Sequence, residues 1–121
     1  MSSSLERRRR IREALIRAEA ESPGVKSRAE RIAVFSVAIA DRLGFPDDVL
    51  LAIRELAELR GLPESSELAP DSTGEMRGII GLASKFVEKD SMWLQSEARV
   101  EFDSRLVDAL EAVRLVISPA S

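Results

Sequence analysis

Apolar residues recur at helical spacing in five segments of the chain. These segments cover about residues 5–21, 27–43, 46–60 and 75–89, and a last one follows Asp103. Because an α-helix makes one turn in 3.6 residues, positions three and four apart share a face, and each segment predicts a helix with one buried side. The expected inner faces are Ile11, Ala14, Leu15 and Ala18; Ile32, Phe35, Ser36, Ile39, Ala40 and Leu43; Val49, Leu50, Ile53, Leu56, Ala57 and Leu59 or Arg60; Met76, Ile79, Ile80, Ala83, Phe86 and Val87; and Leu106, Leu110, Val113 and Val116 or Ile117.

Turn-forming residues separate these segments. Ser22-Pro23-Gly24 is expected to end the first helix, because proline cannot continue the hydrogen-bond ladder and glycine accepts left-handed dihedral angles. Gly44 is expected to close the second helix, and Pro46 with the two aspartates after it opens the third. Ser2 to Ser4 and Asp103 are the expected caps of the first and last helices.

Two segments lack a clear helical period. Residues 61–74, GLPESSELAPDSTG, are rich in proline, serine and acids and predict a surface loop. Residues 91–101, SMWLQSEARVE, fit either a short helix or a turn in which Trp93 and Leu94 form a plug. The pattern as a whole predicts an all-α fold, a compact bundle of five to six helices.

The core of this bundle is expected to contain one residue from each of the four most regular helices. These residues are Ile39, Ile53, Ile80 and Leu110. Gly78 and Gly81 in the fourth helix are expected to let another helix approach closely.

Composition narrows the possible chemistry. The 121 residues suffice for one domain, and 4% aromatic residues with no tyrosine favour packing of aliphatic helices. The absence of cysteine and histidine excludes disulfides, thiolate chemistry and the commonest general base and metal ligand. No apolar run approaches the roughly 18 residues that a membrane span needs, and the charged start does not resemble a signal peptide, so a cytoplasmic protein is expected.

Charge is unevenly distributed along the chain. Residues 1–31 hold nine basic and five acidic residues, whereas residues 32–121 hold nine basic and sixteen acidic ones. The run Arg7 to Arg10 is interpreted as the solvated flank of a helix, paired with Glu6 and Glu13. Binding of nucleic acid by this basic arm is the weaker interpretation, because the arm has no aromatic stacking residues and the acidic body would repel a polyanion.

Three stretches occur in the order of one known family. SPGVKSRAERIAVFSVAIADRLGFPDDVLLAIRELAEL at residues 22–59 resembles the opening of an HD-GYP domain, the HD-superfamily class of cyclic di-GMP phosphodiesterases. GIIGLASKFVEKD at residues 78–90 resembles the family's "RILAVADAYDAL" helix, and VEFDSRLVDALEAV at residues 100–113 resembles its closing "tqFDP.vV.af" helix. The resemblance spans about residues 14–116 and implies an HD-like helical fold.

The resemblance does not extend to the catalytic residues of the family. The first histidine ligand falls on Arg28, the His-Asp pair on Arg60-Gly61, and the aspartate of the later helix on Ser84. Aligning the pair backward from Pro63 instead places it on Glu55-Leu56, and the family's central section, with the GYP loop, is missing between Pro63 and Gly74. A hydrolytic metal needs several converging N or O ligands, and guanidinium groups repel a divalent ion. These positions are therefore read as vestiges of a metal site, and no cofactor is expected.

The expected function is that of a non-catalytic, HD-GYP-like interaction or signalling-scaffold domain. Residues 1–24 are expected to form a basic helix that folds as one unit with a degenerate HD-like domain at residues 25–121. The partner is a protein, either a signalling protein or a second copy in a two-fold dimer that includes the first helix. The candidate interaction residues are Ile11, Leu15, Ile16, Met92 and Trp93.

Two other functions remain open at this stage. Arg28 and Arg60 suit phosphate, which predicts a sensor that binds a nucleotide or cyclic dinucleotide without cleaving it. The simpler interpretation pairs each arginine with a nearby acid, such as Glu30, Glu55, Glu58 or Glu64. Acid catalysis by carboxylates alone is the weakest alternative, and its candidates are Asp41, Glu55, Glu58, Glu88 and Asp90.

Overall fold

The computed structural model describes residues 2–60 and 73–117, and within them it contains seven helices and no strand. The helices are α1 (Ser2–Glu21), α2 (Val25–Arg42), α3 (Asp47–Leu59), α4 (Gly74–Glu88), α5 (Ser91–Ser96), α6 (Ala98–Glu101) and α7 (Ser104–Ile117). The predicted all-α class is confirmed. The ambiguous segment forms the two short helices α5 and α6, which exceeds the expected five to six helices. Residues 61–72 of the expected loop lie outside the described residues.

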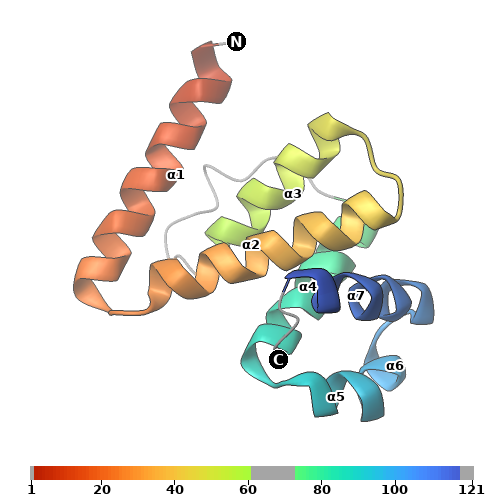
Figure 1. The fold of residues 1–121 in the computed structure, drawn as a ribbon. Helices are drawn as coiled ribbons and strands as arrows, with labels where there is room; N and C mark the ends of the chain where they lie inside the picture. The colour runs from red at the N-terminus through yellow and green to blue at the C-terminus, as the bar shows by residue number, and fades with distance from the viewer. Residues whose placement is uncertain (1, 61–72, 118–121) are drawn as a thin grey trace.

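Helix α2 is central to the bundle. It packs against α1, α3, α4 and α7, whereas α5 and α6 lie at the far end of α4 and α7 (Figure 1). Helix α1 leaves the start of α2 at a steep angle and extends away from α4 to α7 (Figure 1). The molecule is therefore a body of α2 to α7 with one helix laid against its α2 and α3 side.

The main core lies around α2 and confirms the predicted helical faces. Ile39, Ile53 and Leu110 have no exposed surface, Ile80 is 4% exposed, and all four belong to one buried cluster. Phe35 and Phe86 meet edge to face with ring centroids 5.1 Å apart. The last turn of α7 differs from the prediction. Val116, one of the two residues expected there on the inner face, is 81% exposed and does not belong to this cluster.

A second, smaller cluster joins α1 to the body. Ile11 and Leu15 of α1 pack with Ala29 of α2 and Leu59 of α3, and all four side chains are buried. None of the described residues of α1 belongs to the main core. The attachment of α1 is thus a separate and smaller hydrophobic contact.

The turn between α1 and α2 is stabilised by a glutamate. Gly24 adopts φ of 99° and precedes α2 directly, as expected for a helix stop, but glycine has no side chain that could cap the new helix. The carboxylate of Glu19 accepts hydrogen bonds from the backbone N–H groups of Gly24 and Lys26, both at 3.0 Å. These bonds lower the pKa of Glu19 below its ordinary value, because they favour the charged form. Sequence reasoning did not identify this cap.

The other helix ends follow the expected chemistry with one exception. Thr73 accepts a hydrogen bond from the Met76 N–H at 3.2 Å, and Asp90 accepts one from the Trp93 N–H at 3.0 Å. Asp103 accepts one from the Arg105 N–H at 2.8 Å, as predicted for the start of the last helix. The exception is the first helix, which begins at Ser2, so the serines expected as caps are part of the helix itself. Serine only mildly disfavours a helix and does not stop one.

Gly78 and Gly81, the two glycines inside α4, face side chains and not a helix backbone. A Cβ atom added at Gly78 would lie 3.5 Å from Leu106 Cδ1, and one added at Gly81 would lie 3.5 Å from the Phe102 ring. These are ordinary contact distances. Leu106 of α7 thus packs on Gly78, but the neighbouring side chains leave room for a methyl group, so neither glycine is required for this approach.

Candidate functional site

The positions predicted from the resemblance to be vestiges of a metal site hold an ion pair and a buried serine. Arg28, in the first turn of α2, lies 4.0 Å from the carboxylate of Glu88 at the end of α4, and both side chains are about half exposed. Ser84 is buried one turn before Glu88. Arg60 is exposed directly after α3, and Gly61 lies outside the described residues. Arg28 thus pairs with an acid, though not with one of the acids expected for it.

The ends of α2 and α3 that carry these arginines adjoin one another. Ala29 and Leu59, the chain neighbours of Arg28 and Arg60, pack in the same small cluster. The helix order therefore brings three of the four positions that were predicted to be vestigial, Arg28, Arg60 and Ser84, to one side of the bundle. Across residues 2–60 and 73–117, no group of three or more Asp, Glu, His or Cys side chains is placed to hold a metal ion.

The acids considered for catalysis are dispersed among different roles. Glu88 pairs with Arg28, and Asp90 caps α5. Asp41 shares one hollow with Glu58, and Glu88 shares another with Asp90. Glu55 and Glu58 line a pocket together.

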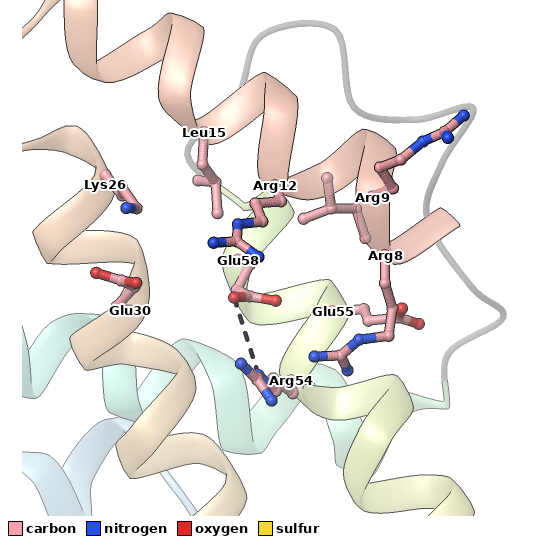
Figure 2. Close-up of a pocket in the computed structure, with 10 residues that line it drawn as sticks. Arg8, Arg9, Arg12, Leu15, Lys26, Glu30, Arg54, Glu55 and Glu58 are labelled. Atoms are coloured by element: carbon pink, nitrogen blue, oxygen red, sulfur yellow. Dashed lines mark ion pairs between the residues drawn. The ribbon is translucent and has the colours of Figure 1, made fainter. Parts of the chain in front are cut away.

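That pocket, here called the charged pocket, lies between α1, α2 and α3 and has a volume of about 430 Å³. Figure 2 shows most of its side chains projecting from the three helices toward one another, whereas Arg9 points away from them. Its lining consists of Arg8, Arg9, Ile11, Arg12, Leu15, Lys26, Glu30, Arg54, Glu55 and Glu58. Five cations thus face three carboxylates above an apolar floor.

Glu55 is the most buried charged group of this pocket. Its side chain is 4% exposed, and its Oε1 atom lies 3.7 Å from Arg7 Nη1 of α1. Among the described residues its Oε2 atom has no hydrogen-bond partner. Glu55 lies four residues before Leu59, so α3 has a second buried face directed at α1, beside the face of Ile53 and Ala57 that meets the main core.

Glu58 is affected by the same burial. Burial raises the pKa of Glu58, and the negative charges of Glu55 and Glu30 raise it further. Two arginines lower this pKa: Arg54, whose Nε atom lies 3.9 Å from Glu58 Oε2, and Arg8 of α1. Their effect does not cancel that of burial. The acidic residues of α2 and α3 on this surface therefore favour the packing of a basic helix against them.

The basic run of α1 contributes to this contact. Arg9 pairs with Glu13 at 3.9 Å, which confirms part of the solvated-flank interpretation. Arg7, in contrast, reaches the buried Glu55 and not Glu6. The interpretation of the whole run as solvated is therefore wrong for Arg7, because α1 folds back over α3.

A second hollow, here called the apolar groove, adjoins the charged pocket. It has a volume of about 620 Å³ between α2, α3 and the end of α7. Its apolar lining is Ala33, Val34, Val37, Ala38, Leu50 and Ile117, and its charged rim is Glu30, Asp41, Arg54 and Glu58. Glu30, Arg54 and Glu58 line both hollows, so the two form one continuous surface. Val34 is 49% exposed at this groove.

Three of the five predicted interaction residues are buried within the chain. Ile11 is 2% exposed, Leu15 is 3% exposed and Trp93 is 6% exposed. Ile11 and Leu15 form the contact of α1 with the body. Trp93 packs edge to face on Phe102, with ring centroids 6.1 Å apart. Their predicted availability to a partner is therefore wrong. Ile16 and Met92 are exposed, as that prediction requires.

The apolar groove was missed by sequence reasoning although a signal exists. Val34, Val37 and Ala38 lie outside the predicted inner face of α2 and make its apolar arc wider than one face requires. Ile117 completes the groove from a helix far along the chain. Only the tertiary arrangement joins these residues.

Comparisons of the chain with protein-family models, curated proteins and solved structures find no match. Within the described ranges, no helix has both the length and the apolar character needed to cross a membrane.

Proposed function

We propose that this chain is a non-catalytic interaction module, a signalling scaffold built on an HD-GYP-like order of helices, and that the apolar groove is its docking surface. The observation that supports docking most directly is the groove itself, which exposes Val34 and Ile117 beside a rim of charged residues. Apolar surface gathered in a hollow with a polar rim is typical of sites that bind another protein or a ligand.

The loss of catalysis is supported by the residues at the expected ligand positions. Arg28 and Arg60 are cations, Ser84 is a poor metal ligand, and the sequence contains no histidine. A divalent metal would meet positive charge here and too few oxygen or nitrogen donors. We expect gently purified protein to contain zinc, iron and manganese at well below one atom per chain, and to leave cyclic di-GMP intact. Stoichiometric metal, with turnover that a chelator abolishes, would contradict the proposal.

Docking at the groove is tested by a matched pair of substitutions. Val34→Glu places a charge in the groove, whereas Val100→Glu places one on α6, where the native valine is 87% exposed. In affinity purification from the source cells, we expect proteins retained by the wild type to be lost with Val34→Glu and kept with Val100→Glu. If the retained proteins are the same for all three chains, the groove is not the docking surface.

A second candidate function is binding of an anion in the charged pocket, in place of the expected site at Arg28 and Arg60. Arg8, Arg12 and Lys26 line this pocket, and within the described residues none of them has an ion pair of 4.0 Å or less. Guanidinium groups bind phosphate well, but the three nearby carboxylates oppose an anion, which makes this the second choice.

Calorimetric titration with cyclic di-GMP and with inorganic phosphate tests anion binding. If the pocket binds either one, Arg12→Ala should weaken the affinity at least about tenfold, while Arg28→Ala leaves it unchanged. If neither probe binds the wild type, or if only Arg28→Ala has an effect, the charged pocket is not an anion site.

A further inference from the structure

The partner of the apolar groove can be specified further, on the basis of the proposed docking function. We infer that the groove binds helix α1 of a second copy of this chain, so that two chains exchange contacts of α1 and groove around a two-fold axis. The inference starts from a face of α1 that its own body does not cover.

This face, here called the outer stripe, consists of Leu5, Arg9, Arg12 and Ile16. All four residues are exposed, Leu5 by 74% and Ile16 by 52%. At 3.6 residues per turn they lie within about 60° of one another around the helix axis. Ile11 and Leu15, which anchor α1 to its own body, lie about 110° away on average. The outer stripe therefore points sideways from the anchored face. Its two arginines also line the charged pocket, whereas Leu5 and Ile16 are exposed outside that pocket and stay available to a neighbour.

The outer stripe and the apolar groove match in character and length. The stripe has an apolar residue at each end and two arginines between them. The groove has an apolar floor, and its rim carries three carboxylates and one arginine, Arg54, so the rim is acidic on balance. Leu5 and Ile16 are eleven residues apart, and so are Glu30 and Asp41, which bound the groove along α2. Each interval corresponds to about 16 Å of helix.

The chain itself shows that this surface accepts a basic helix. Its own α1 inserts Ile11 and Leu15 between α2 and α3 and extends Arg7 to the buried Glu55. The apolar groove continues from that contact through Glu30, Arg54 and Glu58, which line both hollows. Helix α1 of a second copy, bound in the groove, makes the same kinds of contact beside the first. Its apolar side chains meet the apolar floor, and its arginines lie near the carboxylates of the rim.

Two-fold symmetry favours a second copy over another protein as the occupant. Each chain carries both an outer stripe and a groove, so a reciprocal pair buries both kinds of surface twice and leaves neither exposed. This dimer retains the expected participation of the first helix through Leu5 and Ile16, without Ile11 and Leu15, which are buried against the body of their own chain.

Light scattering and sedimentation of the purified full chain over a concentration series test the inference. We expect a mass of twice 13.3 kDa for the wild type at high concentration. Val34→Glu in the groove and the pair Leu5→Glu with Ile16→Glu on the stripe should each raise the dissociation constant at least about tenfold, whereas Val100→Glu should not change it. Circular dichroism of each variant checks that the helices are retained.

Cross-linking locates the contact and does not depend on disruptive substitutions. Because the chain has no cysteine, one preparation with Ile16→Cys and another with Val34→Cys each carry a single thiol. Mixed and mildly oxidised, they should form a disulfide-linked heterodimer, whereas Ile16→Cys mixed with Val100→Cys should not.

The outcomes separate this inference from the proposed function. A wild type that stays monomeric, or a dimer that neither set of glutamate substitutions weakens, overturns the inference. If the protein is monomeric but loses a cellular partner through Val34→Glu, the groove docks another protein and only the proposed function stands. If Val34 affects neither dimer nor partner, both are wrong.

Discussion

Ser36 is a polar residue in the interior of the main core. It lies on the buried face of α2 with no exposed surface, and its hydroxyl has no hydrogen-bond partner among the described residues. A buried hydroxyl without a partner loses its hydrogen bonds to water and gains none in return. The position thus reduces the stability of the fold.

Ser36→Ala should therefore stabilise the protein by about 1 kcal/mol, since it removes the buried hydroxyl. Part of any gain comes from the higher helix propensity of alanine. Ser27→Ala, at an exposed position of the same helix, measures that part alone. Urea unfolding of both variants checks the prediction, and an equal change in the two would show that the hydroxyl of Ser36 has a partner.

Ile53 is the corresponding apolar case. It is fully buried on α3 and belongs to the main core with Ile39, Ile80 and Leu110. Alanine at any of these four positions leaves a cavity and should cost about 2 to 5 kcal/mol of unfolding free energy. Val100→Ala, at an exposed site on α6, serves as the control for unfolding in urea. A loss below about 1 kcal/mol at two of the core sites would contradict the observed packing.

The turn between α1 and α2 is the most informative feature at the scale of the helices. Glu19 of α1 supplies the cap that Gly24 lacks, and it bonds two N–H groups at the start of α2. The same contact fixes the direction in which α1 leaves α2. It is strong only while Glu19 is ionised, because the charged carboxylate accepts both bonds.

Glu19→Gln should lower the midpoint of urea unfolding at pH 7 and have a decreasing effect toward acid. The folded-state pKa of Glu19 lies below its ordinary value of 4.5. Its contribution is thus complete above pH 4.5 and is lost as the pH falls through the lowered folded-state pKa. Glu21→Gln, on the exposed end of the same helix, is the control. A difference from wild type that stays constant between pH 7 and pH 3 would rule out this cap.

At the scale of the whole molecule, the chain divides into a self-contained body and an attached helix. The main core draws no described residue from α1, whose contact consists of Ile11 and Leu15 with Ala29 and Leu59, and the pairing of Arg7 with Glu55. Removal of α1 would therefore expose a small apolar area and leave Glu55 without its cation.

A chain that starts at residue 25 should keep its helices α2 to α7 and unfold cooperatively, with a lower stability than the full chain. Glu55→Gln in the truncated chain should change its stability little, because removal of α1 exposes to water the carboxylate that Arg7 neutralised. The same substitution in the full chain should not stabilise. Calorimetry with far-UV circular dichroism measures these effects, and a truncated chain without a transition would mean that α1 is part of the folding core.

The sequence by itself determined the helices, their buried faces and the four central core residues, because periodicity, glycine and proline are local signals. It also determined which chemistry has no residues to support it, since histidine and cysteine are absent. The cap by Glu19, the burial of Glu55 and the apolar groove were decided only by the tertiary structure. Each depends on where α1 and the end of α7 lie against α2 and α3, and side chains from distant segments become neighbours only after the helices pack. The same holds for Ile11 and Leu15. Their apolar character was evident from the sequence, but only the packing of the helices shows that they attach α1 to its own chain and are not a surface for a partner.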